Sequence, residues 1–158
     1  MVNIGNKAPD FSLSGIDEAG NEKIYTLQEL LKENNLVVYF YPKDNTPGCT
    51  QEACDFRDNF NRIISKAAVI GVSPDSIKSH KSFQQKQSLN FALISDPDHK
   101  LAEDLGVWGE KKMYGKSYMG IIRSTFIIGK DGIIKALWNN VKVKGHVDEV
   151  IAALEKLG

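Results

Sequence analysis

The sequence predicts an α/β fold in which a central mixed β-sheet carries helices on both faces. Short apolar runs alternate with longer amphipathic stretches along the chain, which is typical of strands that alternate with helices. Near the C-terminus, Gly129-Lys130-Asp131-Gly132 separates two apolar runs and indicates a β-hairpin, so part of the sheet is expected to be antiparallel. Several α/β folds share this pattern, and periodicity alone does not choose among them.

The first half of the chain predicts a short helix, a buried strand and a longer helix. Residues 27–33 are amphipathic, and residues 36–41 form a continuous apolar run that indicates a buried strand. A helix is expected over 47–65, because Thr46 can cap its start through the hydroxyl and Pro47 suits the first helical position. One stripe of this helix, at i, i+4, i+7, i+11 and i+14, consists of Cys49, Ala53, Phe56, Phe60 and Ile63.

The second half repeats the alternation. Short apolar runs predict strands over 67–72, 91–94, 125–128 and 133–138. Helical spacing predicts helices over 76–87, 100–105 and 146–157. Pro74 starts the first of these segments after a strand, with Ser73 or Asp75 as its expected cap. We find no repeat, low-complexity tract or linker, and residues 1–158 are expected to form a single domain.

The composition is that of an ordinary globular protein, with 42% hydrophobic and 25% charged residues. The formal net charge is zero and the pI is about 6.8, so no electrostatic sign of a nucleic-acid partner is present. Two short basic runs, at 111–112 and 142–144, are interrupted by apolar residues. We interpret them as solvated faces or strand edges.

Cysteine usage and the first residues suggest a compartment. The N-terminal residues lack the apolar core of a signal peptide, and no segment approaches the roughly 20 apolar residues of a membrane span. We therefore expect a cytoplasmic protein without a membrane partner. There, two nearby cysteines indicate redox chemistry or metal binding rather than a structural disulfide. His80, His99 and His146 show no metal-ligand spacing, so no metal or other cofactor is expected.

Both cysteines lie within the segment 42–54, so any thiol chemistry must happen there. Cys49 falls in the first turn of the predicted helix. Unpaired backbone N–H groups and the positive end of the helix dipole favour a thiolate at this position. Cys49 could instead be a small buried hydrophobic side chain, as free cysteines often are, but the flanking Pro, Thr and Gly residues favour a reactive thiol.

The spacing of Cys49 and Cys54 prevents a disulfide while the helix is intact. Five residues correspond to ~7.5 Å of rise and ~140° of rotation along an ideal helix. The two Cα atoms would then lie roughly 8.7 Å apart, beyond the ~7 Å limit for a disulfide. Either the start of the helix unwinds on oxidation, or the two thiols never bond.

The motif Pro-x-x-x-Thr-x-x-Cys, formed by Pro42, Thr46 and Cys49, resembles the active-site signature of the peroxiredoxins. The second cysteine is similar to that of the atypical two-cysteine branch called peroxiredoxin Q or bacterioferritin comigratory protein. The resemblance covers nearly the whole chain and implies a thioredoxin-like fold. Its other matching stretches are Ala8-Pro9-Asp10-Phe11, Ser95-Asp96-Pro97, residues 106–112 and residues 118–126.

The resemblance also implies the reaction and its residues. Cys49 would be the peroxidatic and Cys54 the resolving cysteine, joined in a disulfide during turnover. Pro42 would shield the thiolate from water, and Thr46 would donate or accept through its hydroxyl. Arg123 would supply a permanent charge that favours the thiolate and holds a peroxide oxygen. Substrates would be hydrogen peroxide and alkyl hydroperoxides, and thioredoxin or a similar dithiol protein the reductant.

Other interpretations stay open at this point. A thioredoxin-like disulfide oxidoreductase would share the fold, but it normally uses Cys-x-x-Cys, which this chain lacks. A redox sensor or holdase would react with peroxide but turn over poorly with any reductase. A zinc site would need the two cysteines and a histidine to converge from distant segments. Cys54 could also be an inert thiol, since the family contains one-cysteine members.

Less specific residues carry weaker expectations. Gln51 could hydrogen-bond near the active site, although a solvated helix position fits equally well. An aromatic cluster in the core or on the surface is favoured over a pocket rim for Trp108, Tyr114, Tyr118 and Met119. Relatives of this type are often monomers and sometimes dimers, so we expect a monomer with a dimer as the alternative.

Overall fold

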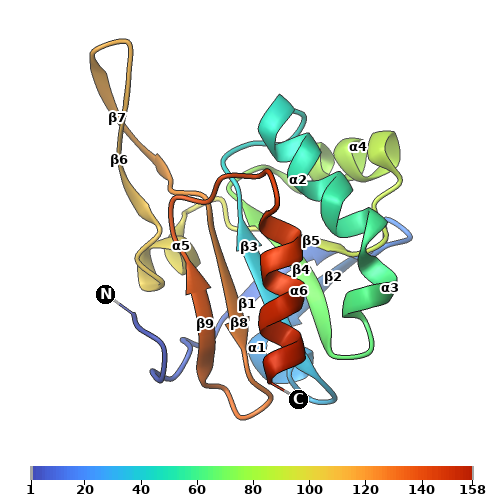
Figure 1. The fold of residues 1–158 in the computed structure, drawn as a ribbon. Coiled ribbons are helices and arrows are strands. Elements are labelled where there is room, and N and C mark those ends of the chain that lie inside the picture. The colour runs from blue at the N-terminus through green and yellow to red at the C-terminus, as the bar shows by residue number, and fades with distance from the viewer. Residues whose placement is uncertain (1, 158) are drawn as a thin grey trace.

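The computed structural model describes residues 2–157, and its framework is a seven-stranded sheet with the order β2-β1-β5-β4-β3-β8-β9 (Figure 1). The strands of this sheet are β1 (Ser12–Ile16), β2 (Glu22–Thr26), β3 (Asn35–Phe40), β4 (Ala67–Ser73), β5 (Ala92–Ser95), β8 (Ser124–Ile128) and β9 (Ile134–Trp138). A separate hairpin consists of β6 (Trp108–Met113) and β7 (Lys116–Ile121). All five predicted strands are present, with bounds shifted by one residue at most.

The centre of the sheet is parallel and its flanks are antiparallel. Strand β3 pairs in parallel with β4 and antiparallel with β8, so Val38 lies between Ile70 and Phe126. Strand β5 extends the parallel part, and the hairpin β8–β9 forms one edge. The continuous apolar runs of the central strands fit burial on both faces. The predicted mixed sheet is confirmed.

Helices cover both faces of the sheet (Figure 1). They are α1 (Leu27–Leu30), α2 (Pro47–Asp58), α3 (Phe60–Ile63), α4 (Ile77–Gln87), α5 (Lys100–Asp104) and α6 (His146–Lys156). Alternate residues of β3 divide the core: Val37 and Tyr39 pack with α2, α3, α4 and α6, whereas Val38 and Phe40 pack with α1 and α5. The predicted apolar stripe of α2 and α3 does enter this core, with Cys49 and Phe56 at most 1% exposed.

Beyond the start of α2, three details of the predicted helices are wrong. The helix expected over 47–65 is divided at Asn59, which leaves helical geometry (φ −105°, ψ 11°) while its side-chain amide donates to the Asp55 carbonyl. Helix α1 ends at Leu30, three residues before the expected end. The cap of α4 is Ser76, whose Oγ accepts the Ser79 N–H at 3.1 Å; neither Ser73 nor Asp75 caps it.

Two hairpins are absent from the sequence-based prediction. Strands β1 and β2 form an antiparallel pair that joins the sheet through β5. Strands β6 and β7 form an arm that extends away from the body of the molecule (Figure 1). Tyr114 and Gly115 close this arm in the left-handed region, at φ 53° and 76°. Within residues 2–157, every helix is too short or too polar to cross a membrane.

Candidate active site

The candidate site lies at the start of α2, directly after the carboxyl end of β3. Pro47 occupies the first helical turn, and the first intrahelical bond along the turn runs from the Thr50 N–H to the Thr46 carbonyl at 2.8 Å. The N–H groups of Gly48 and Cys49 precede that bond and are therefore available to an anion. Cys49 is 1% exposed, so its sulfur lies in a place from which bulk water is largely excluded.

Arg123 reaches Cys49 from a segment 74 residues away in the chain. It stands immediately before β8, the neighbour of β3 in the sheet. Its Nη2 lies 3.3 Å from the Cys49 sulfur, and its Nη1 lies 2.7 Å from Oε1 of Glu52. Burial works to lower the pKa of Arg123, but the charges of Glu52 and Cys49 outweigh this effect and raise the pKa. The guanidinium is thus a permanent cation beside the sulfur.

Glu52 is the component of the site that the sequence reasoning missed. Its side chain is completely buried one turn after Cys49, and its Oε2 lacks a hydrogen-bond partner. Burial raises the pKa of Glu52 to about 7, although the neighbouring Arg123 works in the opposite direction. The three-residue spacing from Cys49 places both side chains on one helix face, which was the available signal.

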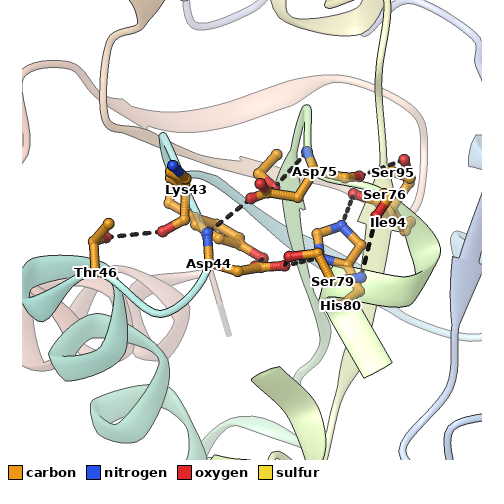
Figure 2. A network of polar contacts seen from close by, with 11 residues as sticks. Lys43, Asp44, Thr46, Asp75, Ser76, Ser79, His80, Ile94 and Ser95 are labelled. Carbon is orange, nitrogen blue, oxygen red and sulfur yellow. Dashed lines mark hydrogen bonds and ion pairs between the residues drawn. The ribbon is translucent and has the colours of Figure 1, made fainter. Parts of the chain in front are cut away.

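Thr46 occupies the N-cap position of α2, but the predicted cap through its hydroxyl is wrong. Its Oγ1 instead donates a hydrogen bond to the Lys43 carbonyl at 2.8 Å (Figure 2). The hydroxyl hydrogen is used in this bond, so the oxygen can only accept from any further partner. Pro42 is half-buried and follows β3 at the beginning of the same loop.

Cys54 lies on the same uninterrupted helix as Cys49, and both thiols are free. It is partly exposed, and its Sγ contacts Oε1 of Gln87, the last residue of α4, at 3.6 Å. Gln51 hydrogen-bonds to Asp55 on the exposed side of α2 and takes no part in the site.

Lys111 on the β6–β7 arm contributes a second cation near the site. Its Nζ donates to the Ile121 carbonyl at 2.8 Å, and Ile121 is two residues from Arg123. Burial lowers the pKa of Lys111, the Arg123 charge lowers it further, and Cys49 acts to raise it. Lys111 is half-buried and Lys112 is exposed, and both lie on β6, an edge strand of a two-stranded sheet, so the run 111–112 fits the expected strand edge.

The aromatic residues of the arm do not form one cluster. Trp108 stacks on His99 with ring centroids 3.8 Å apart, at the base of the arm. Tyr114 is 96% exposed at its tip, and Met119 is 55% exposed. Across residues 2–157, the described side chains form no group of three histidine, cysteine, aspartate or glutamate residues arranged to hold a metal.

Comparison with known proteins identifies the family. A family model described as the AhpC/TSA family matches residues 4–137. The chain is also 48% identical to "Peroxiredoxin Bcp" of Bacillus subtilis over 157 residues, which covers 99% of this chain and 97% of the relative. The chain belongs to the peroxiredoxins of the AhpC/TSA family. It is therefore a thiol peroxidase by family, and the resemblance of its sequence motifs is confirmed.

Further relatives of this peroxiredoxin are named Bcp or PrxQ, the branch that its sequence motifs resemble. A putative peroxiredoxin Bcp from Coxiella burnetii is 48% identical over 155 residues, covering 97% of this chain and 99% of the relative. A solved structure of a PrxQ mutant from Xylella fastidiosa superposes with a TM-score of 0.90 at 40% identity, covering 99% of this chain and 97% of that chain. The bacterioferritin comigratory protein of Xanthomonas campestris gives 0.84 at 42% identity, with 92% and 90% covered. The predicted thioredoxin-like fold is confirmed.

Proposed function

We propose that this peroxiredoxin reduces hydrogen peroxide and organic hydroperoxides with the Cys49 thiolate, and that Cys54 resolves the oxidised sulfur. The observation that carries the proposal is the 3.3 Å contact between Arg123 Nη2 and the buried Cys49 sulfur at the start of α2. A cation and a helix N-terminus both favour a thiolate, which is the nucleophilic form of cysteine.

In the first step, the thiolate attacks one oxygen of the peroxide O–O bond. The bond breaks, the sulfur becomes a sulfenic acid, and the second oxygen leaves as water or an alcohol after taking up a proton. As the O–O bond breaks, negative charge moves from the sulfur to the leaving oxygen. Arg123 and the free N–H groups of Gly48 and Cys49 are the donors available to stabilise this charge. Thr46 can accept a hydrogen bond from the peroxide O–H, because its own hydrogen is bonded to Lys43.

In the second step, the Cys54 thiol condenses with the sulfenic acid, and water leaves as the disulfide forms. Both cysteines lie on intact α2, so the helix start must unwind before the two sulfurs can meet. Gly48 lowers the resistance to this change, since glycine gains the most backbone freedom on unwinding. The resulting disulfide would be reduced by an external dithiol, with transfer of two electrons that restores both thiols.

The proposed substrates are supported by one relative, and the proposed reductant by the chemistry of the disulfide. The Xanthomonas campestris relative is described by its alkyl peroxide reduction activity, which supports organic hydroperoxides as substrates beside hydrogen peroxide. The chain has no Cys-x-x-Cys of its own to regenerate the disulfide. We therefore assign the recycling step to thioredoxin or a similar dithiol protein.

The test is peroxide-dependent NADPH oxidation with thioredoxin and thioredoxin reductase, for wild type, Cys49→Ser and Cys54→Ser. We expect activity in wild type alone, and a sulfenic acid trapped only in Cys54→Ser. Turnover by Cys54→Ser would show a one-cysteine mechanism. A reactive Cys49 without turnover in wild type would instead favour a redox sensor.

A further inference from the structure

One peptide group in the loop before α2 is held from both sides. The carbonyl of Lys43 accepts the Thr46 hydroxyl at 2.8 Å, and the N–H of Asp44, which belongs to the same peptide, donates to Oδ2 of Asp75 at 2.7 Å (Figure 2). Because a peptide group is planar, the direction of its N–H determines the direction of its carbonyl. Asp75 therefore sets where the Thr46 hydroxyl points.

Asp75 is itself fixed by the end of β4. Ser73 donates from its hydroxyl to Oδ2 of Asp75 at 2.7 Å, and the Asp75 N–H donates back to the Ser73 Oγ at 3.2 Å. The Asp75 carbonyl accepts the Ser95 hydroxyl at 2.6 Å. The acceptor that holds the loop is thus anchored to β4 and β5, the rigid centre of the sheet.

The side chain of Asp44 supplies the second anchor. Its Oδ1 accepts the Tyr41 hydroxyl at 2.6 Å, and its Oδ2 lies 2.8 Å from the Ser79 hydroxyl and 2.7 Å from Nδ1 of His80. Asp44 and His80 are both at least 95% buried. A buried carboxylate is stable only when its oxygens are paired, as they are here, so the loop is confined to one conformation.

His80 carries this anchor onto the sheet. Its Nε2 lies 3.0 Å from the Ile94 carbonyl of β5, so each ring nitrogen faces an oxygen acceptor. The ring is therefore held between the Asp44 carboxyl group and β5. Figure 2 shows the chain of contacts from Ile94 through His80 and Asp44 to the loop that carries Thr46.

We propose that Asp75, Asp44 and His80 are positioning residues that orient the Thr46 hydroxyl as a hydrogen-bond acceptor for the peroxide. The proposal rests on the proposed function, in which Thr46 contacts the substrate. It assigns a role in the reaction to a buried network that the peroxide itself does not touch.

The experiment measures single-turnover rates in a Cys54→Ser background, where Cys49 is the one remaining thiol. Thr46→Val, Asp75→Ala, Asp75→Asn and the double variant Thr46→Val/Asp75→Ala are each reacted with hydrogen peroxide and, separately, with iodoacetamide. Iodoacetamide reports the reactivity of the sulfur without needing an acceptor for a peroxide hydrogen. Gln84→Met is the matched control. Gln84 is a buried polar residue on the same helix as His80, but its side chain donates to the Glu18 and Leu89 carbonyls and makes no hydrogen bond to the loop before α2.

We expect Thr46→Val to slow the peroxide reaction by about 100-fold and Asp75→Ala by roughly tenfold, with iodoacetamide rates changed less than about twofold. Asp75→Asn should restore the rate, because its amide oxygen can accept from both Asp44 and Ser73. The double variant should be no slower than Thr46→Val, since the network acts only through that hydroxyl. If Asp75→Ala does not fold, Ser73→Ala should slow the peroxide reaction in the same direction.

Independent losses that multiply in the double variant would overturn the role of the network. So would equal losses with both reagents, which would mean a disturbed Cys49, or an unchanged peroxide rate in Asp75→Ala. A parent protein that does not react with peroxide would instead refute the proposed function, and with it the role assigned to Thr46.

Discussion

Glu52 and Arg123 form an ion pair inside the protein, with the carboxylate Oε1 2.7 Å from the guanidinium Nη1. The pair connects the first turns of α2 to the segment before β8. Because Glu52 holds one nitrogen of the guanidinium, the plane of the group is fixed and the second terminal nitrogen meets the Cys49 sulfur. The planar fork of arginine permits this double contact, and the single ammonium group of lysine does not.

Arg123→Lys should therefore lower the second-order rate of the peroxide reaction, although the charge is kept. We expect a loss of roughly 100-fold, the usual effect of removing one donor from developing charge. Stopped-flow mixing of the reduced variant with hydrogen peroxide measures this rate. Arg62→Lys is the control, because Arg62 is exposed and pairs with Asp148 at 3.4 Å. A rate for Arg123→Lys within a factor of two of wild type would contradict the prediction.

Glu52→Gln should stabilise the folded protein at alkaline pH. Burial raises the pKa of Glu52 in the folded state from 4.5 to about 7, so the stability associated with its neutral form is complete below pH ~4.5 and is lost as the pH rises through about 7. The shift, which already includes the opposing effect of Arg123, corresponds to about 3 kcal/mol at most.

Urea unfolding at pH 5 and pH 8 measures this effect. Wild type should lose more of its free energy of unfolding between these two values than Glu52→Gln does. Glu155→Gln, an exposed change on α6, should behave as wild type. An equal pH dependence in wild type and Glu52→Gln would show that the Glu52 carboxyl ionises without cost.

The central strands could be predicted because their signal is local. Residues 36–41 are apolar without interruption, and such a run is buried in almost any α/β arrangement. The arm formed by β6 and β7 has no such run. Polar and apolar side chains are both exposed on it, for example Lys112 and Met119, so its strands show no continuous apolar pattern. Its sequence signal was Gly115, because glycine readily adopts the left-handed conformation that closes a tight hairpin. The structure has both Tyr114 and Gly115 in this conformation.

The site was predictable where one short segment carries it. Cys49 and Thr46 belong to one motif, and the structure brings Arg123 to Cys49 as expected. Glu52 was missed because a glutamate near a helix start is usually solvated, and its spacing from Cys49 does not by itself reveal burial against Arg123, 71 positions away. The catalytic roles of all five residues predicted for the site stay predictions.

Gly48→Ala should affect both steps of the reaction, by different mechanisms. A Cβ at this position would lie 3.2 Å from Nη2 of Arg123, which is held by Cys49 and Glu52 and has little room to move. The attack on peroxide should slow by a small factor. Alanine also makes helix unwinding harder by about 0.5–1 kcal/mol, so disulfide formation should slow by about two- to fivefold.

Rapid quenching after a peroxide pulse separates the two steps, by counting sulfenic acid and disulfide over time. The longer-lived sulfenic acid should also make Gly48→Ala more sensitive to irreversible oxidation at high peroxide. Gln51→Ala is the control, because glutamine and alanine differ little in helix propensity and Gln51 points away from the site. Disulfide formation as fast as in wild type would mean that unwinding of α2 does not limit the second step.

Oxidation to the Cys49–Cys54 disulfide should unwind the start of α2 and leave the loop before it in place. Ideal helical geometry holds the two Cα atoms roughly 8.7 Å apart, so a bond between the sulfurs requires loss of hydrogen bonds such as that from Thr50 to Thr46. Hydrogen exchange of the amides at 50–54 should become at least roughly tenfold faster in the oxidised protein. The Asp44 amide should stay protected, because its acceptor, Asp75, lies outside α2.

Amides of α4 serve as the internal reference for this comparison, and Cys54→Ser treated with peroxide serves as the variant that cannot form the disulfide. That variant should keep slow exchange at 50–54, because a sulfenic acid alone does not require the helix to open. Fast exchange at Asp44 as well would show that the opening extends through the loop. A disulfide with unchanged exchange at 50–54 would contradict the helical geometry on which the resolving step depends.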